Sequence, residues 1–166
     1  MADEKSIWQG NPSQLINGPV FLLCALAVGL LWGISGVLVY RHTVAAPVAL
    51  AMAGAAIVPF GLGLFKWLTV RSLRYELTTE RLLMSSGIFS RSSEALELYR
   101  VKDYELQEPF VLRLFGLGNL VLLTHDESNP TVLLRAIPGA KALRDQIRQH
   151  VEECRDKKRV RVAELE

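Results

Sequence analysis

Two long runs of uncharged, mostly apolar residues fill much of the first half of the chain. The first, Val20–Tyr40, has 21 residues. As a helix with about 1.5 Å of rise per residue it would reach about 31 Å, the thickness of a bilayer's hydrocarbon core. The second, Thr43–Phe65, also lacks charge, and neither run has the polar face of a helix that covers a soluble core. We therefore predict transmembrane helices at residues 20–40 and 47–68, joined by an outer loop at 41–46.

The first run is the stronger of the two predicted spans. Twelve of its residues are Leu, Ile, Val or Phe, and at about −0.3 to −0.6 kcal/mol each they contribute roughly −4 to −7 kcal/mol towards insertion. The second run is diluted by glycine and by Pro47 and Pro59. A cleaved signal peptide is a poor alternative. Asp3 and Glu4 make the leading segment acidic, and the first run is longer than the apolar region of a signal peptide, which usually has about 7–15 residues. We expect both helices to be retained.

Charged residues predict the orientation of the two spans. Four cations follow the second run, Lys66, Arg71, Arg74 and Arg81, whereas the outer loop and the leading segment offer one each. The positive-inside rule therefore places both termini in the cytoplasm. Within the first span, small residues recur at every fourth position, at Ala25, Gly29 and Gly33. This stripe is either a contact at which two helix backbones approach closely or a chance spacing in a helix rich in small residues.

The pattern changes at Leu73 to short strand-like segments separated by turns. We predict strands at residues 73–78, 81–85, 95–99, 102–107, 120–124 and 131–136, and a short helix at 109–115. From Pro138 to Lys158, an amphipathic helix carries Leu143, Ile147, Val151 and Cys154 on one face. The fold class is α+β with membrane helices: a two-helix hairpin, then an antiparallel barrel or sandwich over residues 72–158 that a C-terminal helix caps.

The ends of the chain are predicted to lie outside this core. Residues 1–19 form a cytoplasmic segment in which Trp8 is the only aromatic side chain. Trp8 lies at the inner membrane surface or packs on the soluble domain, and we slightly favour the membrane surface. The last residues, 159–166, form a tail. The outward face of the final hairpin is also apolar, with Val121, Leu123 and Leu133, which suggests that the C-terminal helix covers it.

Composition and charge narrow the classes of function. Half of the residues are hydrophobic and the formal net charge is +2, too near neutral for a nucleic-acid-binding protein. Cys24 and Cys154 have no metal-site spacing and are expected in the bilayer and in a reducing cytoplasm, so we predict no disulfide.

No arrangement of residues predicts catalysis, and we expect no cofactor and no bound metal. His125 and Asp126 are neighbours on a loop, and such neighbours seldom form a working dyad. His150 and Cys154 are four residues apart on a helix, but two ligands are too few for zinc. We therefore expect a protein that is not an enzyme.

A candidate interaction surface lies between residues 100 and 115. Its polar part comprises Arg100, Lys102, Asp103 and Arg113, and its apolar part includes Phe110 and Leu114. The polar residues either form a docking surface or pair with one another to fix a strand against the short helix, and we favour the pairing. The apolar part is too rich for one side of a two-turn helix to bury, which predicts a contact with another protein chain.

The C-terminal helix ends in a basic segment that includes Arg155, Lys157, Lys158, Arg159 and Arg161. Cations at a helix C-terminus are stabilised by the helix dipole, which is one explanation of the segment. In a domain held at the inner leaflet, each cation near anionic lipid also contributes about 1 kcal/mol. We therefore predict that this tail touches the membrane surface.

Several motifs resemble the bacterial pleckstrin-homology family of membrane-flanked proteins. They are Tyr75–Arg81, Gly87, Leu98–Asp103, and Gln107 followed by Arg113–Asn119, together with the leading Trp8-x-Gly10-x-Pro12-Ser13. The resemblance implies a pleckstrin-homology-like domain in the bacterial inner membrane that acts as an assembly or adaptor module, as a homo-oligomer or with a paralogue that carries several domain copies. The alternative is a sensor of anionic lipid headgroups or small anions. Only Arg81, beside Glu80, occupies the loop that binds headgroups in eukaryotic relatives.

Overall fold

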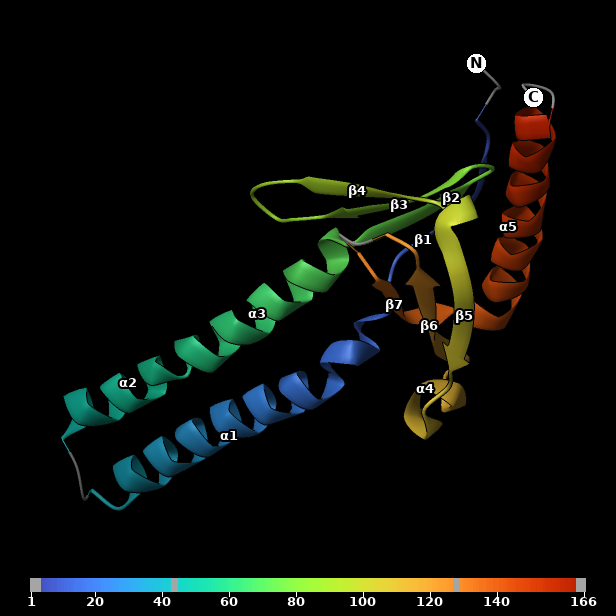
Figure 1. The fold of residues 1–166 in the computed structure, drawn as a ribbon. Helices are drawn as coiled ribbons and strands as arrows, with labels where there is room; N and C mark the ends of the chain where they lie inside the picture. The colour runs from blue at the N-terminus through green and yellow to red at the C-terminus, as the bar shows by residue number, and fades with distance from the viewer. Residues whose placement is uncertain (1–3, 43–44, 127–128, 164–166) are drawn as a thin grey trace. The chain divides into compact units, whose positions relative to one another are not determined.

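The computed structural model of the protein describes residues 4–42, 45–126 and 129–163 and contains two compact units. One unit is Asn17–Thr69, and the other combines Met1–Ile16 with Val70–Glu166. Figure 1 shows the helices and strands of both.

The smaller unit contains the predicted pair of long helices. It begins with the end of a 3-10 turn, η1 (Gln14–Asn17), followed by α1 (Gly18–Tyr40), α2 (Ala46–Ala55) and α3 (Ile57–Ser72). Pro19 lies in the first turn of α1, where its fixed φ suits the helix and its missing N–H would have no partner. Two helical stretches, Gln14–Tyr40 and Leu50–Ser72, are long and apolar enough to cross a membrane.

The second predicted span is two helices, because the chain is interrupted at Ala56. Pro59 has no N–H to donate to the carbonyl of Ala55, and its ring crowds that carbonyl. The hydrogen bonds adjust around this point. The Ala56 N–H donates to Ala53 O at 3.3 Å, a tighter turn than that of an α-helix, and the Phe60 N–H donates to Ala56 O at 3.3 Å.

Of the two interpretations of the small-residue stripe, close contact between helix backbones has no support at Gly29 and Gly33 within the described helices. A Cβ added at Gly29 or Gly33 would meet no atom within 4 Å. Ala25 and Gly29 instead line an apolar cleft of about 540 Å³. Polar contacts connect the helices of this unit, since the Asn17 side chain donates to Lys66 O at 2.9 Å and the Trp32 indole donates to Ala53 O at 3.3 Å.

The larger unit is built from two antiparallel sheets and a long helix (Figure 1). One sheet has the order β1-β2-β3-β4 and the other β5-β6-β7. The strands are β1 (Ser6–Gly10), β2 (Arg74–Thr78), β3 (Arg81–Ser86), β4 (Ser92–Glu97), β5 (Val101–Gln107), β6 (Leu117–Thr124) and β7 (Thr131–Pro138). A 3-10 turn, η2 (Leu98–Arg100), joins the sheets, α4 (Phe110–Leu114) lies between β5 and β6, and α5 (Ala140–Ala163) follows β7. This arrangement confirms the predicted fold class.

The leading segment is part of the domain, which corrects the predicted boundary at residues 1–19. β1 pairs with β2 in antiparallel register, with Gly10 opposite Tyr75 and Gln9 opposite Glu76. Trp8 packs against the hydrophobic core, and a Cβ on Gly10 would overlap its ring. The slightly favoured position of Trp8 at the membrane surface is therefore wrong. The helical unit is an insertion between two paired strands.

Replacing Trp8 with alanine is expected to destabilise the larger unit by about 2 kcal/mol, less than the 3–5 kcal/mol of a fully buried aromatic residue, because Trp8 is half-buried. For a unit of this size, the midpoint of thermal unfolding of the full chain in detergent should fall by about 10 °C. Gln9→Ala is the control, since the Gln9 side chain is exposed and bonds to the side chains of Ser6 and Glu76 at the surface. Equal midpoints for the two variants would contradict the packing of Trp8.

The core of this unit lies between the sheets and α5. Alternate residues of β6 and β7 are fully buried, including Leu120, Leu122 and Leu134. The predicted apolar face of the C-terminal helix is confirmed, because Leu143, Ile147 and Val151 join the same core and Cys154 packs beside it.

The opposite face of the final hairpin differs from the prediction. Leu123 and Leu133 remain 38% and 36% exposed. Because α5 buries its apolar face against the same core as Leu120 and Leu134, it covers the other side of the hairpin.

Candidate functional site

The most apolar exposed surface in the described part of the larger unit is on α4. Pro109, with an extended backbone, precedes the helix, and Gly116, with φ of +66°, ends it after a few residues. Phe110 is 82% and Leu114 72% exposed, and Val111 and Phe115 are exposed as well. We call these four residues the α4 patch.

The α4 patch can bind another apolar surface, but it contains no group for acid–base or metal chemistry. A five-residue helix, little more than one turn, cannot direct its own large apolar side chains and that of Phe115 towards one core. Leu112 is half-buried, whereas the patch lies on the remaining sides together with the exposed cation Arg113. Aromatic residues beside an arginine are typical of the centre of a protein interface.

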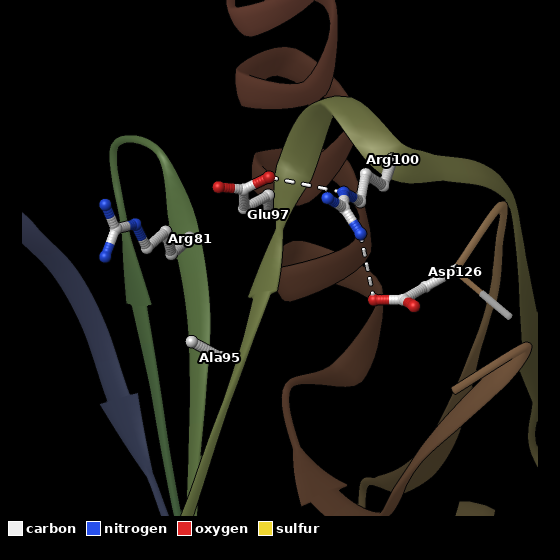
Figure 2. A pocket seen from close by; sticks show the side chains of 5 residues that line it. All are labelled: Arg81, Ala95, Glu97, Arg100 and Asp126. Carbon is white, nitrogen blue, oxygen red and sulfur yellow. Dashed lines mark hydrogen bonds and ion pairs between the residues drawn. The ribbon is translucent and has the colours of Figure 1, made fainter. Parts of the chain in front are cut away.

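A polar depression of about 300 Å³ lies elsewhere on the same unit, lined by Arg81, Ala95, Glu97, Arg100 and Asp126. Figure 2 shows the Arg100 guanidinium between two carboxylates. Its Nε lies 3.2 Å from Glu97 Oε2 and its Nη1 lies 3.2 Å from Asp126 Oδ2. The guanidinium of Arg81 points away from them (Figure 2), and its Nε lies 3.9 Å from Glu4 Oε1.

The charges of this depression largely neutralise one another. The hydrogen bond from Arg100 to the Tyr99 hydroxyl, and then the charges around it, including those of Asp126 and Glu97, raise the pKa of the guanidinium above its ordinary value. Arg100 is paired with both carboxylates and Arg81 lies near Glu4, so the depression does not concentrate positive charge for an anionic ligand. The ion pairs connect the η2 corner to the segment after β6 and favour a structural role.

The predicted polar cluster is not assembled. Arg100 pairs with Glu97 and Asp126 instead of Asp103. Asp103 accepts a hydrogen bond from the backbone N–H of Tyr104, and among the described residues neither Asp103 nor Arg113 forms an ion pair. Lys102 is exposed on β5. The expected pairing is wrong in its partners because Arg100 lies in the η2 corner, where Glu97 and Asp126 are both 3.2 Å from its guanidinium.

Two cations of the predicted lipid-facing tail are engaged within the domain. A guanidinium N–H of Arg155 donates to Val101 O, and the Lys158 ammonium lies 3.3 Å from the centre of the Tyr99 ring. The predicted tail boundary is also wrong, because α5 continues to Ala163. Lys157 is exposed, whereas the side chains of Arg159 and Arg161 are outside the described structure.

Cys154 and His150 have structural partners. The Cys154 thiol donates to Thr79 O at 3.2 Å, and burial raises its pKa, which disfavours the thiolate. His150 Nδ1 lies 3.1 Å from Glu153 Oε2, and the hydrogen bond from Gln149 lowers the pKa of Glu153. Within residues 4–42, 45–126 and 129–163, no group of three His, Cys, Asp or Glu side chains is placed to hold a metal ion.

Comparison with known proteins identifies the family. The model of the family described as "Bacterial PH domain" matches residues 14–151. The chain belongs to this family. This PH-domain chain is also similar to a crystal structure of a DUF1696 family protein with a pleckstrin-homology domain from Shewanella loihica PV-4, at 11% identity and a TM-score of 0.42, over 49% of this chain and 73% of that one. No curated protein sequence matches it.

Sequence reasoning found part of the α4 patch, through Phe110 and Leu114, but missed the partners in the polar depression. Glu97 and Arg100 are three residues apart, a spacing that brings side chains together on a helical turn. This spacing could have predicted the ion pair between Glu97 and Arg100. Asp126 is 26 residues further along, and only the folding of β6 beside β5 brings it to Arg100.

Proposed function

We propose that this PH-domain protein is a non-enzymatic assembly or adaptor module, held at the cytoplasmic face of a bacterial inner membrane by two transmembrane segments. The exposed surface of its helices supports the anchor. Large apolar side chains such as Leu26, Leu30 and Phe60 are more than half exposed within the helical unit. A soluble protein would bury most of such a helix, whereas lipid tails solvate it.

The pairing of β1 with β2 supports an even number of spans. The helical unit leaves the sheet after β1 and returns at β2, and Gly10 lies opposite Tyr75. Two strands in one sheet must be on the same side of a bilayer. The chain between them therefore crosses the membrane twice or not at all, which agrees with the orientation that the cations Lys66 and Arg71 predict.

The α4 patch is the observation on which the assembly role rests. Exposed Phe110 and Leu114 on a short rigid helix provide an apolar surface that a second copy, or a paralogue carrying the same domain, would bury. A partner held in the same membrane meets this surface at high effective concentration. The proposal therefore names membrane proteins as partners and does not include nucleic acid.

Changing Phe110 and Leu114 together to serine is expected to dissociate the assembly, with the dissociation constant rising at least about tenfold because two central apolar contacts are lost. Native mass spectrometry of the full chain extracted with its lipids measures the oligomer and any partner together. The matched control is Leu123→Ser with Leu133→Ser, which removes two exposed apolar side chains from the outer face of β6 and β7. If only the control variant lost the assembly, the interface would lie on that sheet and not on the α4 patch.

The alternative, a sensor of anionic headgroups or small anions, has less support. Arg155 and Lys158 interact with Val101 and Tyr99 within the domain, and Arg100 is neutralised by two carboxylates. A lipid-binding basic surface requires cations free to reach phosphate groups.

A further inference from the structure

The tip of the β3–β4 hairpin exposes an aromatic side chain that has no role in the assembly proposal. Phe89 is 96% exposed, and it lies between the half-buried Ile88 and the polar Ser90 and Arg91. Gly87 fixes the turn, since its φ is +120° and a Cβ there would collide with the carbonyl oxygen of Ser90. We call residues 87–91 the apolar tip. An exposed aromatic side chain on a turn with a fixed backbone indicates a contact with another apolar surface.

The register of the sheet places the apolar tip at the end of β2 that follows α3. Arg74, the first residue of β2, lies opposite Ser85, and Ser86 lies opposite Ser92, so the tip continues past the start of β2. The last turn of α3, from Val70, belongs to the same compact unit as these strands. Figure 1 shows β3 and β4 as one long hairpin beside β2.

Chain length sets how far the apolar tip can lie from the end of α3. Ser72 is two residues before Arg74, which spans at most about 7 Å, and paired strands lie about 5 Å apart. From Ser85 to Phe89 the chain adds up to about 14 Å. Phe89 therefore lies within about 26 Å of the residue at which the second span ends. This upper limit holds for any orientation of the helical unit, because it depends only on chain length and on the pairing of β2 with β3.

We propose that the apolar tip inserts into the headgroup region of the same bilayer that holds α1 and α3. This inference rests on the membrane anchor of the proposed function. Phe89 would enter the boundary between headgroups and acyl chains, while the guanidinium of Arg91 stays at the level of the lipid phosphates. The tip would thus fix the orientation of the domain against the membrane.

The small size of the tip favours a lipid surface over a protein partner. A stable protein interface buries about 800 Å² on each side, far more than Ile88 and Phe89 can supply. Insertion into the anchoring membrane needs less, because the tether from Ser72 to Arg74 makes the contact intramolecular and one aromatic side chain is then enough to bias the orientation.

The test places a fluorophore beside the tip without removing Phe89. The full chain with Cys24→Ala and Cys154→Ala receives an environment-sensitive dye at Ser90→Cys and is reconstituted, at about one chain per vesicle, in phosphatidylcholine and phosphatidylglycerol with nitroxide-labelled acyl chains. We expect the dye at residue 90 to be quenched about twofold more than the same dye at Glu80→Cys, because an inserted segment lies about 5–10 Å deep. Glu80 lies in the turn between β2 and β3, at the opposite end of this sheet from the apolar tip.

Phe89→Ser is the matched variant, and the structure predicts an unchanged fold because the side chain is almost fully exposed. The dye at residue 90 should then be quenched no more than the dye at residue 80. A dye at Leu30→Cys in α1 reports the anchor. Quenching at residue 30 with equal signals at residues 90 and 80 would overturn tip insertion and leave the anchor intact. No quenching at residue 30 would overturn the anchor and the inference with it. A blue-shifted but unquenched dye at residue 90 would indicate a protein contact and would also overturn insertion.

Discussion

Replacing Leu134 with alanine is expected to lower the free energy of unfolding of the larger unit by about 3 kcal/mol, within the range of about 2–5 kcal/mol for a buried leucine. Leu134 is fully buried on β7 and lies opposite the fully buried Leu120 on β6. The truncated side chain leaves a cavity that β6, β7 and α5 cannot all close, because each is fixed by several other core residues.

Hydrogen exchange of the β6 and β7 amides in the full chain measures this effect. A loss of about 3 kcal/mol makes exchange through global opening roughly 100-fold faster. Leu133→Ala is the matched control, since this neighbour on the same strand is 36% exposed and its loss leaves no closed cavity. Similar protection in both variants would contradict the structure, in which Leu134 is buried and Leu133 is partly exposed.

Arginine at both Leu26 and Leu30 is expected to prevent stable integration of the chain into the membrane. Each arginine near the middle of a span costs about 2.5–3.5 kcal/mol, so the pair opposes insertion by roughly 5–7 kcal/mol. The twelve Leu, Ile, Val and Phe residues of the first run favour insertion by roughly 4–7 kcal/mol. Both leucines are exposed on the helical unit, so within that unit no described residue shields the new charges.

Alkaline extraction of bacterial membranes separates integral from peripheral protein and provides the measurement. The arginine variant should leave the membrane pellet, whereas Leu26→Ala with Leu30→Ala should remain in it, because alanine is tolerated in a span and adds no charge. If the arginine variant resisted extraction as the alanine variant does, α1 would not cross the bilayer.

Most elements of this PH domain were predicted from local sequence patterns. Short segments separated by turns located β2 to β7, although the predicted strand 95–99 ends within η2. The face formed by Leu143, Ile147 and Val151 is buried as the 3.6-residue period requires. These signals are short-range, since each depends on the backbone preferences and side-chain spacing of a few neighbouring residues.

The errors concern contacts between distant segments. Pairing of β1 with β2 joins residues that are more than sixty positions apart, and no local signal in Trp8 or Gly10 specifies Tyr75 as a neighbour. Arg100 was expected near Asp103 in the sequence, but the 3-10 corner at η2 directs it to Asp126. The interruption at Ala56 was closer to local reasoning, since Pro59 alone supplies its physical cause.

The sequence by itself therefore determined the two apolar runs, the order of β2 to β7 with α4 and α5, and the apolar excess of residues 110–115, because these follow from composition and periodicity. Only the tertiary structure decided that the helical unit is an insertion between two paired strands, that Arg155 and Lys158 serve the domain itself, and that Phe89 lies at the end of the sheet reached by α3. The first and third depend on strand register, which the packing of one whole face of a sheet sets, and the second depends on α5 lying beside η2 and β5.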